Sequence, residues 1–188
     1  MLNSKSKVYN MSLIALMCAL IIVSAQLSRF FVIPTPLGDA HFTPQWIIVV
    51  LCGLVLGKNK GAIAVSLYII IGLLGFPVFA SGGGIGYLLK PTFGFLLGYI
   101  VGAYIVGLLS ENLNNYSLKS LIFPLTISFL AYYLTGFVYY YIVANFVFNI
   151  TAGLWLIFAS FCLPTLLPDY IFSIVAGMLC LRLKKILK

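Results

Sequence analysis

Charged residues are scarce in this chain of 188 residues, and acidic ones are scarcest. They make up 7% of the sequence against 63% hydrophobic residues, whereas a soluble domain usually carries about a quarter charged residues. So little charge excludes a water-soluble globular fold. Eleven basic residues face only three acidic ones, for a net charge of +8. The basic residues stand at the ends of apolar runs and not in one stripe, so the sequence predicts a membrane protein without a nucleic-acid partner.

Residues typical of catalysis and metal binding are almost as rare. His41 is the only histidine, and the chain has neither an H-E-x-x-H pattern nor a G-x-S-x-G nucleophile elbow. The four cysteines lie in apolar segments without C-x-x-C spacing, which indicates small hydrophobic side chains. Gly57–Gly61 combine glycine and lysine but lack the phosphate-cradling G-x-x-x-x-G-K-[ST] pattern. We therefore expect no enzyme, no metal and no cofactor, with His41 in an exposed loop.

Six apolar runs predict an all-α membrane domain that occupies residues 1–188. The first run follows Lys5 and Lys7 and ends without an A-x-A cleavage site, so we expect a retained helix and not a signal peptide. A spanning helix takes about 20 residues, so the second and third runs need flanking residues, whereas the fifth is long enough to tilt. The predicted spans are residues 11–32, 44–56, 61–75, 93–109, 121–148 and 168–183.

The positions of the basic residues predict the orientation of these spans. With six spans and both termini in the cytoplasm, nine basic residues lie inside and only Arg29 and Lys90 lie outside. The stretch Gly153–Leu167 is also apolar, but a seventh span would carry the C-terminal charges to the outside. We therefore predict that this stretch is a re-entrant or interfacial element packed on the protein. The nine inside residues are Lys5, Lys7, Lys58, Lys60, Lys119, Arg182, Lys184, Lys185 and Lys188.

Two loops on the predicted outer side are candidates for a binding site. Ile33–Trp46 contains three prolines and Asp39, which favours an ordered loop. Gly75–Gly94 contains a glycine cluster whose backbone is free to approach a ligand or to take positive φ angles. The residues singled out in this second loop are Gly82, Gly83, Gly84, Gly86, Tyr87, Lys90, Pro91 and Thr92.

Two charged residues stand near the outer ends of spans, Lys90 before the fourth and Asp169 at the start of the sixth. Charges at membrane depth are costly and usually face a partner or a cavity. The two residues either pair with each other as a structural ion pair or form opposite poles of a pocket. In the fourth span, Gly94, Gly98 and Gly102 share one helical face, which favours close packing with a neighbouring helix.

At this point the motifs resemble a known family. The run GLLGFPVFASGGGIGYLLKPTFGFLLGYIVGAYIVG (residues 72–107), preceded by TPQWIIVVLCGLVLG (residues 43–57), resembles the biotin-specific substrate-binding subunit, or S component, of energy-coupling-factor transporters. The similarity extends from about Ala15 to Gly177, and its most specific part is the glycine-rich loop followed by YLL-x-PT-x-G. The resemblance implies a six-helix capture subunit in a bacterial plasma membrane, working with a transmembrane coupling subunit and two ATPase subunits. It also implies that the ligand binds near the outer face, under the two loops described above.

The chemistry of biotin suggests roles for particular residues. Its ureido ring carries two N–H donors, its bicycle is apolar and its tail ends in a carboxylate, so the site needs an oxygen acceptor, apolar walls and a cation. Asp169 is the candidate acceptor and Lys90 the candidate cation. The family pattern D-x-x-K at the last helix is only half present, because Phe172 stands where the lysine is expected. The other candidate contacts are Tyr87, Gly83, Gly84, Gly86, Gln45, Asn145 and Tyr141, of which the last three suit helix packing equally well.

Ala15 and Ala19 in the first span are four residues apart and lie on one helical face. This A-x-x-x-A element resembles the docking feature of the transporter class, and packing within the subunit is the alternative. Two other functions stay open from the sequence: capture of a different vitamin, and a structural or assembly role in which the polar loops bind another subunit.

Overall fold

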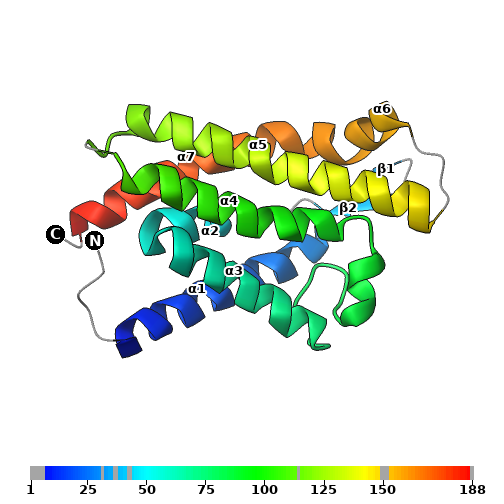
Figure 1. Ribbon diagram of the computed structural model, residues 1–188, viewed down its shortest axis with the longest axis horizontal. Helices are drawn as coiled ribbons and strands as arrows, with labels where there is room; N and C mark the ends of the chain where they lie inside the picture. Colours follow the sequence, from blue (N-terminus) through cyan, green and yellow to red (C-terminus); the bar gives the residue numbers. More distant parts are fainter. Residues whose placement is uncertain are drawn as a thin grey trace.

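The computed structural model describes residues 7–30, 32–35, 38–41, 44–113, 115–148 and 153–186, and this part of the chain is mostly helical (Figure 1). Two short strands pair as an antiparallel ribbon between the first two helices, with Val32 opposite His41. The elements in order are α1 Lys7–Leu27, η1 Ser28–Phe30, β1 Val32–Thr35, β2 Gly38–His41, α2 Gln45–Leu51, η2 Cys52–Leu56, α3 Lys58–Leu73, η3 Ile85–Leu89, α4 Phe93–Glu111, α5 Leu118–Ile142, η4 Val143–Val147, α6 Leu154–Ile157, η5 Phe158–Cys162 and α7 Leu163–Ile186.

Four helical segments in the described residues are long and apolar enough to cross a membrane: Lys7–Leu27, Phe93–Glu111, Leu118–Val147 and Leu163–Lys185. The predicted helical membrane class is therefore confirmed. The count of six spans stays a prediction, because α2 with η2 and α3 are shorter than a full span. The β ribbon was not predicted. It places Asp39 and His41 in β2 and not in an irregular loop, and their side chains lie outside the described part.

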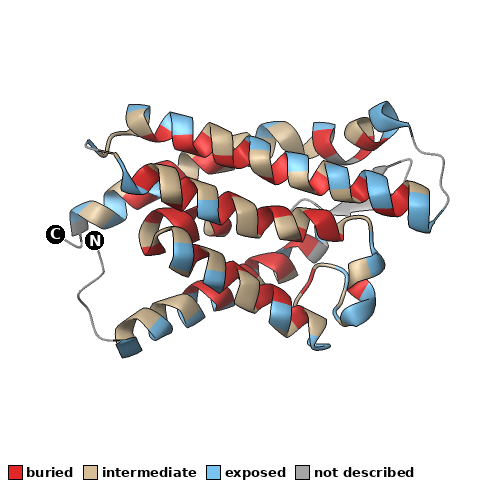
Figure 2. Ribbon diagram, in the orientation of Figure 1, coloured by how far each residue is buried: buried red, intermediate tan, exposed pale blue. Residues whose placement is uncertain are grey.

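The helices form a bundle with two distinct ends (Figure 1). The start of α1, the loop between α4 and α5 and the end of α7 lie together, and we call this the terminal end. The β ribbon, η3 and α6 lie at the opposite end, which we call the loop end. Buried residues follow the faces along which the helices meet, while exposed residues concentrate on the outer surfaces and in η3 and α6 (Figure 2).

The start of α3 shows why its predicted boundary was too late. Gly57 takes a φ of 84°, in the left-handed region that favours glycine, and separates η2 from α3. The backbone N–H of Lys58 donates to Glu111 Oε1 at 3.0 Å, and the Lys58 ammonium lies 3.3 Å from Glu111 Oε2. A residue of α4 therefore caps α3, so the helix begins at Lys58 and not at residue 61.

The glycine face of α4 packs as predicted. A Cβ on Gly98 would lie 2.6 Å from the backbone oxygen of Tyr132, and one on Gly102 would lie 2.6 Å from the Trp46 ring. A Cβ on Gly94 would collide with Tyr139. Only glycine lets α5 and the indole approach so closely, so the prediction of tight helix packing on this face is confirmed.

The prediction that Gly153–Leu167 forms a re-entrant element separate from the last helix was wrong. Helical residues run without a break from α6 through η5 into α7, so this stretch extends the last helix and is not a separate re-entrant element. The predicted sixth span begins at residue 168, but Pro168 lies inside α7. Proline is tolerated within membrane helices when the freed backbone groups find other partners. The whole segment, residues 154–186, is about 50 Å long at 1.5 Å per residue, longer than the hydrocarbon core.

Candidate functional site

Asp169 is the central polar group of the interior. It lies on α7, is only 4% exposed, and its Oδ2 accepts a hydrogen bond from the Tyr133 hydroxyl at 2.8 Å. The same Tyr133 oxygen lies 2.9 Å from Thr165 Oγ1, one turn earlier on α7. Tyr132 is a second side-chain hydrogen-bond partner of Asp169. An ionised carboxylate offers about four lone-pair positions, so two such partners still leave it acceptor capacity.

Trp46 connects α2 to the same face of α7. Its indole N–H donates to Ser173 Oγ at 2.7 Å, and Ser173 in turn donates to the backbone oxygen of Asp169 at 3.0 Å. Trp46 is fully buried. Thr165, Asp169 and Ser173 are spaced by four residues, so α7 presents a row of three oxygen-bearing side chains toward α2 and α5.

Aromatic rings lie beside this row. Trp46 stacks on Tyr132 with ring centroids 4.4 Å apart, and Tyr132 stacks on Tyr99 at 5.2 Å. Tyr132 also lies edge-on to Tyr133 at 4.7 Å. Rings from α2, α4 and α5 therefore surround the polar groups of α7 with flat apolar surfaces.

A second chain of contacts runs from Gln45 to the glycine-rich loop. Gln45 is buried, and its amide donates to the Tyr68 hydroxyl of α3 at 3.0 Å. Tyr68 lies edge-on to Phe79 at 5.4 Å, and Phe79 contacts Tyr87 of η3 at 4.5 Å. The buried Tyr87 therefore anchors the loop to the core, and Gln45 lies next to Trp46 in sequence at the start of α2.

Two glycines fix the shape of this loop. Gly84 has a φ of 100° and its N–H donates to the backbone oxygen of Gly72 at 2.7 Å, while a side chain on Gly83 would collide with the backbone of Phe76. Gly86 is different, because it is exposed and a Cβ there would meet nothing within 4 Å. Gly83 and Gly84 therefore shape the loop, and Gly86 leaves room beside Tyr87.

Lys90 lies on the glycine-rich loop and not beside Asp169. Its ammonium is 3.4 Å from the backbone oxygen of Ser81 and 4.5 Å from the centroid of the Tyr87 ring, and the residue is exposed. Within the described residues the ion pair is Lys58 with Glu111, so Lys90 and Asp169 do not form the structural pair that the sequence allowed. Phe172, in place of the expected lysine, packs partly buried against the core.

Asn145 and Tyr141 lie farther along α5 and η4. The Asn145 amide donates to the backbone oxygen of Tyr141 at 3.0 Å, within one turn of helix, and Tyr141 is exposed. This contact is local to one segment of helix and does not decide between ligand contact and helix packing. The aromatic cluster instead brings together residues that the sequence alone did not single out: Trp46, Tyr99, Tyr132, Tyr133, Thr165 and Ser173. The four-residue spacing around Asp169 was the signal that could have found two of them.

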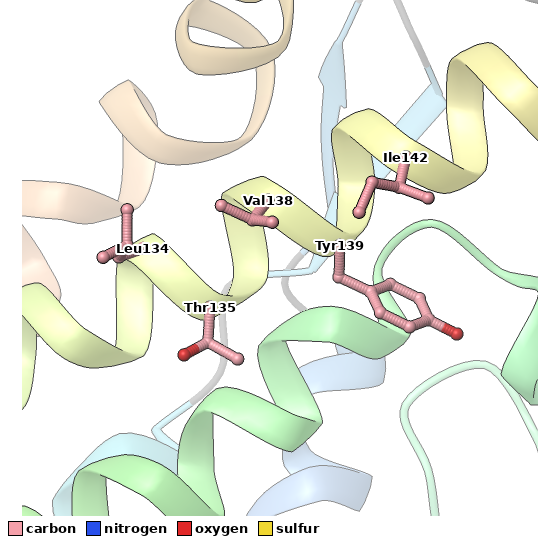
Figure 3. Close-up of a pocket in the computed structure, with 5 residues that line it drawn as sticks. All are labelled: Leu134, Thr135, Val138, Tyr139 and Ile142. Atoms are coloured by element: carbon pink, nitrogen blue, oxygen red, sulfur yellow. The ribbon is translucent and has the colours of Figure 1, made fainter.

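A shallow groove on the outer face of α5 is not a suitable ligand site (Figure 3). Its polar side chains are already used: Thr135 donates to the backbone oxygen of Ala131 and Tyr139 to that of Leu88. The rest of the lining is apolar, with Leu134 65% exposed. The residues that line it are Leu134, Thr135, Val138, Tyr139 and Ile142. This groove faces the surroundings of the bundle and offers no free polar group to orient a ligand.

The Asp169 cluster suits a small molecule with N–H donors and a flat apolar body. The carboxylate is a hydrogen-bond acceptor, the stacked rings of Trp46 and Tyr132 lie beside it, and the glycine-rich loop carries the cation Lys90. Within the described residues no group of three or more metal-ligating side chains is present.

Known proteins resemble this chain along almost its whole length. The profile of the BioY family matches residues 2–188. A probable biotin transporter BioY from Lysinibacillus sphaericus is 33% identical over 176 residues, covering 94% of this chain and 87% of that protein. The biotin transporter BioY of Thermotoga maritima is 37% identical over 171 residues, covering 89% of this chain and 91% of that protein.

A solved structure shares the fold. The crystal structure of the S-component for biotin from an ECF-type ABC transporter superposes with a TM-score of 0.71, covering 95% of this chain and 92% of that chain. Its sequence identity to this chain is 22%. The bundle described above is therefore the fold of an S component.

Proposed function

The chain belongs to the BioY family, and on this premise we propose that it captures biotin at the outer face of a membrane, as the specificity subunit of an ATP-driven vitamin transporter. The family match over residues 2–188 carries the proposal. The relatives are named as transporters, which confirms the prediction that the chain is not an enzyme. The agreement with biotin transporters favours this function over another vitamin and over a structural role.

The Asp169 cluster supports biotin as the ligand. An ureido N–H donates to the Oδ1 side of Asp169, while Tyr133 holds Oδ2 in place. The bicycle lies against the rings of Trp46 and Tyr132. The valerate tail extends toward the glycine-rich loop, where Lys90 meets the carboxylate in place of the lysine that the family pattern puts at Phe172.

The membrane arrangement in this proposal has six crossings, with both chain ends in the cytoplasm of a bacterial cell. Two observations support an even number of crossings. Four helical segments are long and apolar, and the start of α1 lies at the same end of the bundle as the end of α7 (Figure 1). The short segment of α2 and η2 completes its crossing with flanking loop residues. Energy comes from partners, a transmembrane coupling subunit and two ATPase subunits, because the chain lacks a phosphate-cradling motif of its own.

The two tryptophans of the chain allow biotin binding to be measured by fluorescence. Trp46 is buried in the cluster and Trp155 is 73% exposed at the loop end. In the Trp155→Phe variant, biotin should change the emission of the single remaining Trp46 with a saturable, one-site titration. Mass spectrometry of the protein purified in detergent should detect retained biotin. A protein that carries no biotin, and whose Trp46 emission biotin leaves unchanged while another vitamin alters it, would contradict the biotin assignment.

Cysteine labelling tests the orientation. The four native cysteines are buried, which keeps background labelling low. Cysteines placed at the exposed Asn59 and Asn115 should react with impermeant maleimide only from the cytoplasmic side. Asn115 lies in the loop between α4 and α5 at the terminal end, and Asn59 lies in the first turn of α3, which contacts Glu111 at the end of α4. A cysteine at Gly86 should react only from outside; this position is better than Gly83, where a side chain would collide with Phe76. External labelling at Asn115 would contradict the topology.

A further inference from the structure

A cluster of four cations lies at the terminal end where α5 begins and α7 ends. The Lys184 ammonium is 3.2 Å from the centroid of the Tyr116 ring, which joins the last turn of α7 to the residues just before α5. Lys119, in the first turn of α5, and Arg182 and Lys185 are exposed. We call Lys119, Arg182, Lys184 and Lys185 the α5–α7 basic cluster.

Acidic residues do not neutralise this cluster. The chain has three of them. Glu111 pairs with Lys58, Asp169 is buried beside Tyr133, and Asp39 belongs to the β ribbon at the loop end. In the described part of the chain, the α5–α7 basic cluster therefore keeps its full positive charge.

Two of the other basic residues at the terminal end, both on α3, have partners within the protein. Lys58 binds Glu111, and the Lys60 ammonium donates to Asn10 Oδ1 at 3.0 Å, which ties α3 to α1 and α4. Within the described residues, the basic residues of α3 are therefore partnered, whereas those of α5 and α7 have no acidic partner. The positive end of the 25-residue helix α5 lies beside Lys119, while the negative end of α7 lies beside Arg182, Lys184 and Lys185 and partly offsets their charge.

Exposed apolar residues continue from this cluster toward the middle of the bundle. On α5, Ile122 and Phe123 follow Lys119 at helical spacing and are 46% and 65% exposed. On α7, Met178 and Leu179 precede Arg182 by four and three residues and are 43% and 40% exposed. Each of the two helices therefore carries a cation near its terminal end and exposed apolar residues next to it, toward the middle of the bundle. We call these apolar residues, Ile122 and Phe123 on α5 and Met178 and Leu179 on α7, the apolar strips. The arrangement matches a phospholipid, in which a charged headgroup at the membrane surface is joined to acyl chains in the interior.

We propose that the α5–α7 basic cluster binds the headgroup of an anionic phospholipid in the leaflet at the terminal end. The uncompensated charge attracts the phosphate, and the apolar strips accept the acyl chains. The apolar strips favour a lipid over a soluble anion, because a free phosphate has no apolar part that could pack against Phe123 or Leu179. The lipid site lies at the opposite end of the bundle from η3 and the glycine-rich loop, so it is separate from the biotin site (Figure 1).

The test uses the full chain purified in neutral detergent, with phosphatidylglycerol as the probe and phosphatidylcholine as the reference. Native mass spectrometry should show one or more phosphatidylglycerol molecules bound in preference to phosphatidylcholine. A triple variant, Lys119→Gln with Arg182→Gln and Lys185→Gln, should bind phosphatidylglycerol about tenfold more weakly or worse. Lys184 is retained in this variant because its contact with Tyr116 supports the fold.

The matched control removes the same number of charges from the same end: Lys7→Gln with Lys58→Gln and Lys60→Gln. Its lipid binding should stay within about twofold of the parent protein. Equal losses in both variants would overturn the proposal, because they would indicate attraction to net charge alone. Normal lipid binding by the triple variant, with loss of the coupling subunits, would also overturn it and assign the cluster to a protein interface. Biotin affinity should be unchanged in the triple variant, so a failure of the lipid proposal can be distinguished from a failure of the proposed biotin function.

Discussion

Replacing Asp169 with alanine should weaken biotin binding about ten- to a hundredfold, equivalent to about 1.5–3 kcal/mol. The carboxylate is 4% exposed, so a ureido N–H that loses this acceptor has no water to replace it. Titration calorimetry on the detergent-purified variant measures the change. Asp169→Asn should lose less than alanine, because its amide keeps one acceptor oxygen.

The structure indicates that the alanine variant will fold. The Tyr133 hydroxyl, which donates to Asp169, also lies within hydrogen-bond distance of Thr165 and is not left unpaired. The matched control is Glu111→Ala, which removes the acid of the Lys58 ion pair at the end of α4. This control should lower the melting temperature without changing biotin affinity. An Asp169→Ala protein with parental affinity would place the ureido ring elsewhere.

The carboxylate tail can be tested separately from the ring. If Lys90 binds the tail, the parent protein prefers biotin to its tail amide, and Lys90→Ala should remove most of this preference. Asp169→Ala should weaken both ligands by a similar factor, because it affects the ring that they share. Lys90→Ala with an unchanged preference would assign Lys90 to its contacts with Ser81 and Tyr87 alone.

The apolar helices were the part of the fold most accessible from sequence. A membrane helix needs a long apolar run, and such a run is visible without any knowledge of its neighbours. The predicted start of the fourth span, Phe93, is the first residue of α4. The start of the last helix was predicted too late because the charge argument treated Gly153–Leu167 as a separate element. Pro168 lies inside α7, where surrounding groups compensate for its missing N–H.

The site was less accessible, because it depends on which helices become neighbours. Asp169 and Lys90 were found as isolated charges in apolar surroundings. Trp46 and Tyr132 gain their significance only when α2 and α5 meet beside α7, a contact between residues far apart in the sequence. Gln45 was singled out, but its partner Tyr68 could not be identified without the packing of α2 on α3.

Replacing both Ala15 and Ala19 with tryptophan should abolish energised uptake of biotin and co-purification with the coupling subunits, while leaving biotin affinity within about twofold. Both alanines are exposed on α1, whereas Met17, Cys18 and Ile21 form its buried face. This exposure argues against packing inside the subunit, so two indoles add bulk without entering the core. Where lipid removes the hydrophobic drive, helices associate through close packing of small residues, which tryptophan prevents.

The matched control carries the same two tryptophans on a different surface. Leu130 and Leu134 of α5 are also four residues apart and are 56% and 65% exposed, so Leu130→Trp with Leu134→Trp changes apolar bulk equally. Uptake by this control in whole cells should stay close to that of the parent. If the α1 variant loses biotin binding along with uptake, the alanines support the fold and do not dock a partner. If it transports normally, the coupling subunit approaches another face, because two indoles on α1 would hold a closely packed helix away.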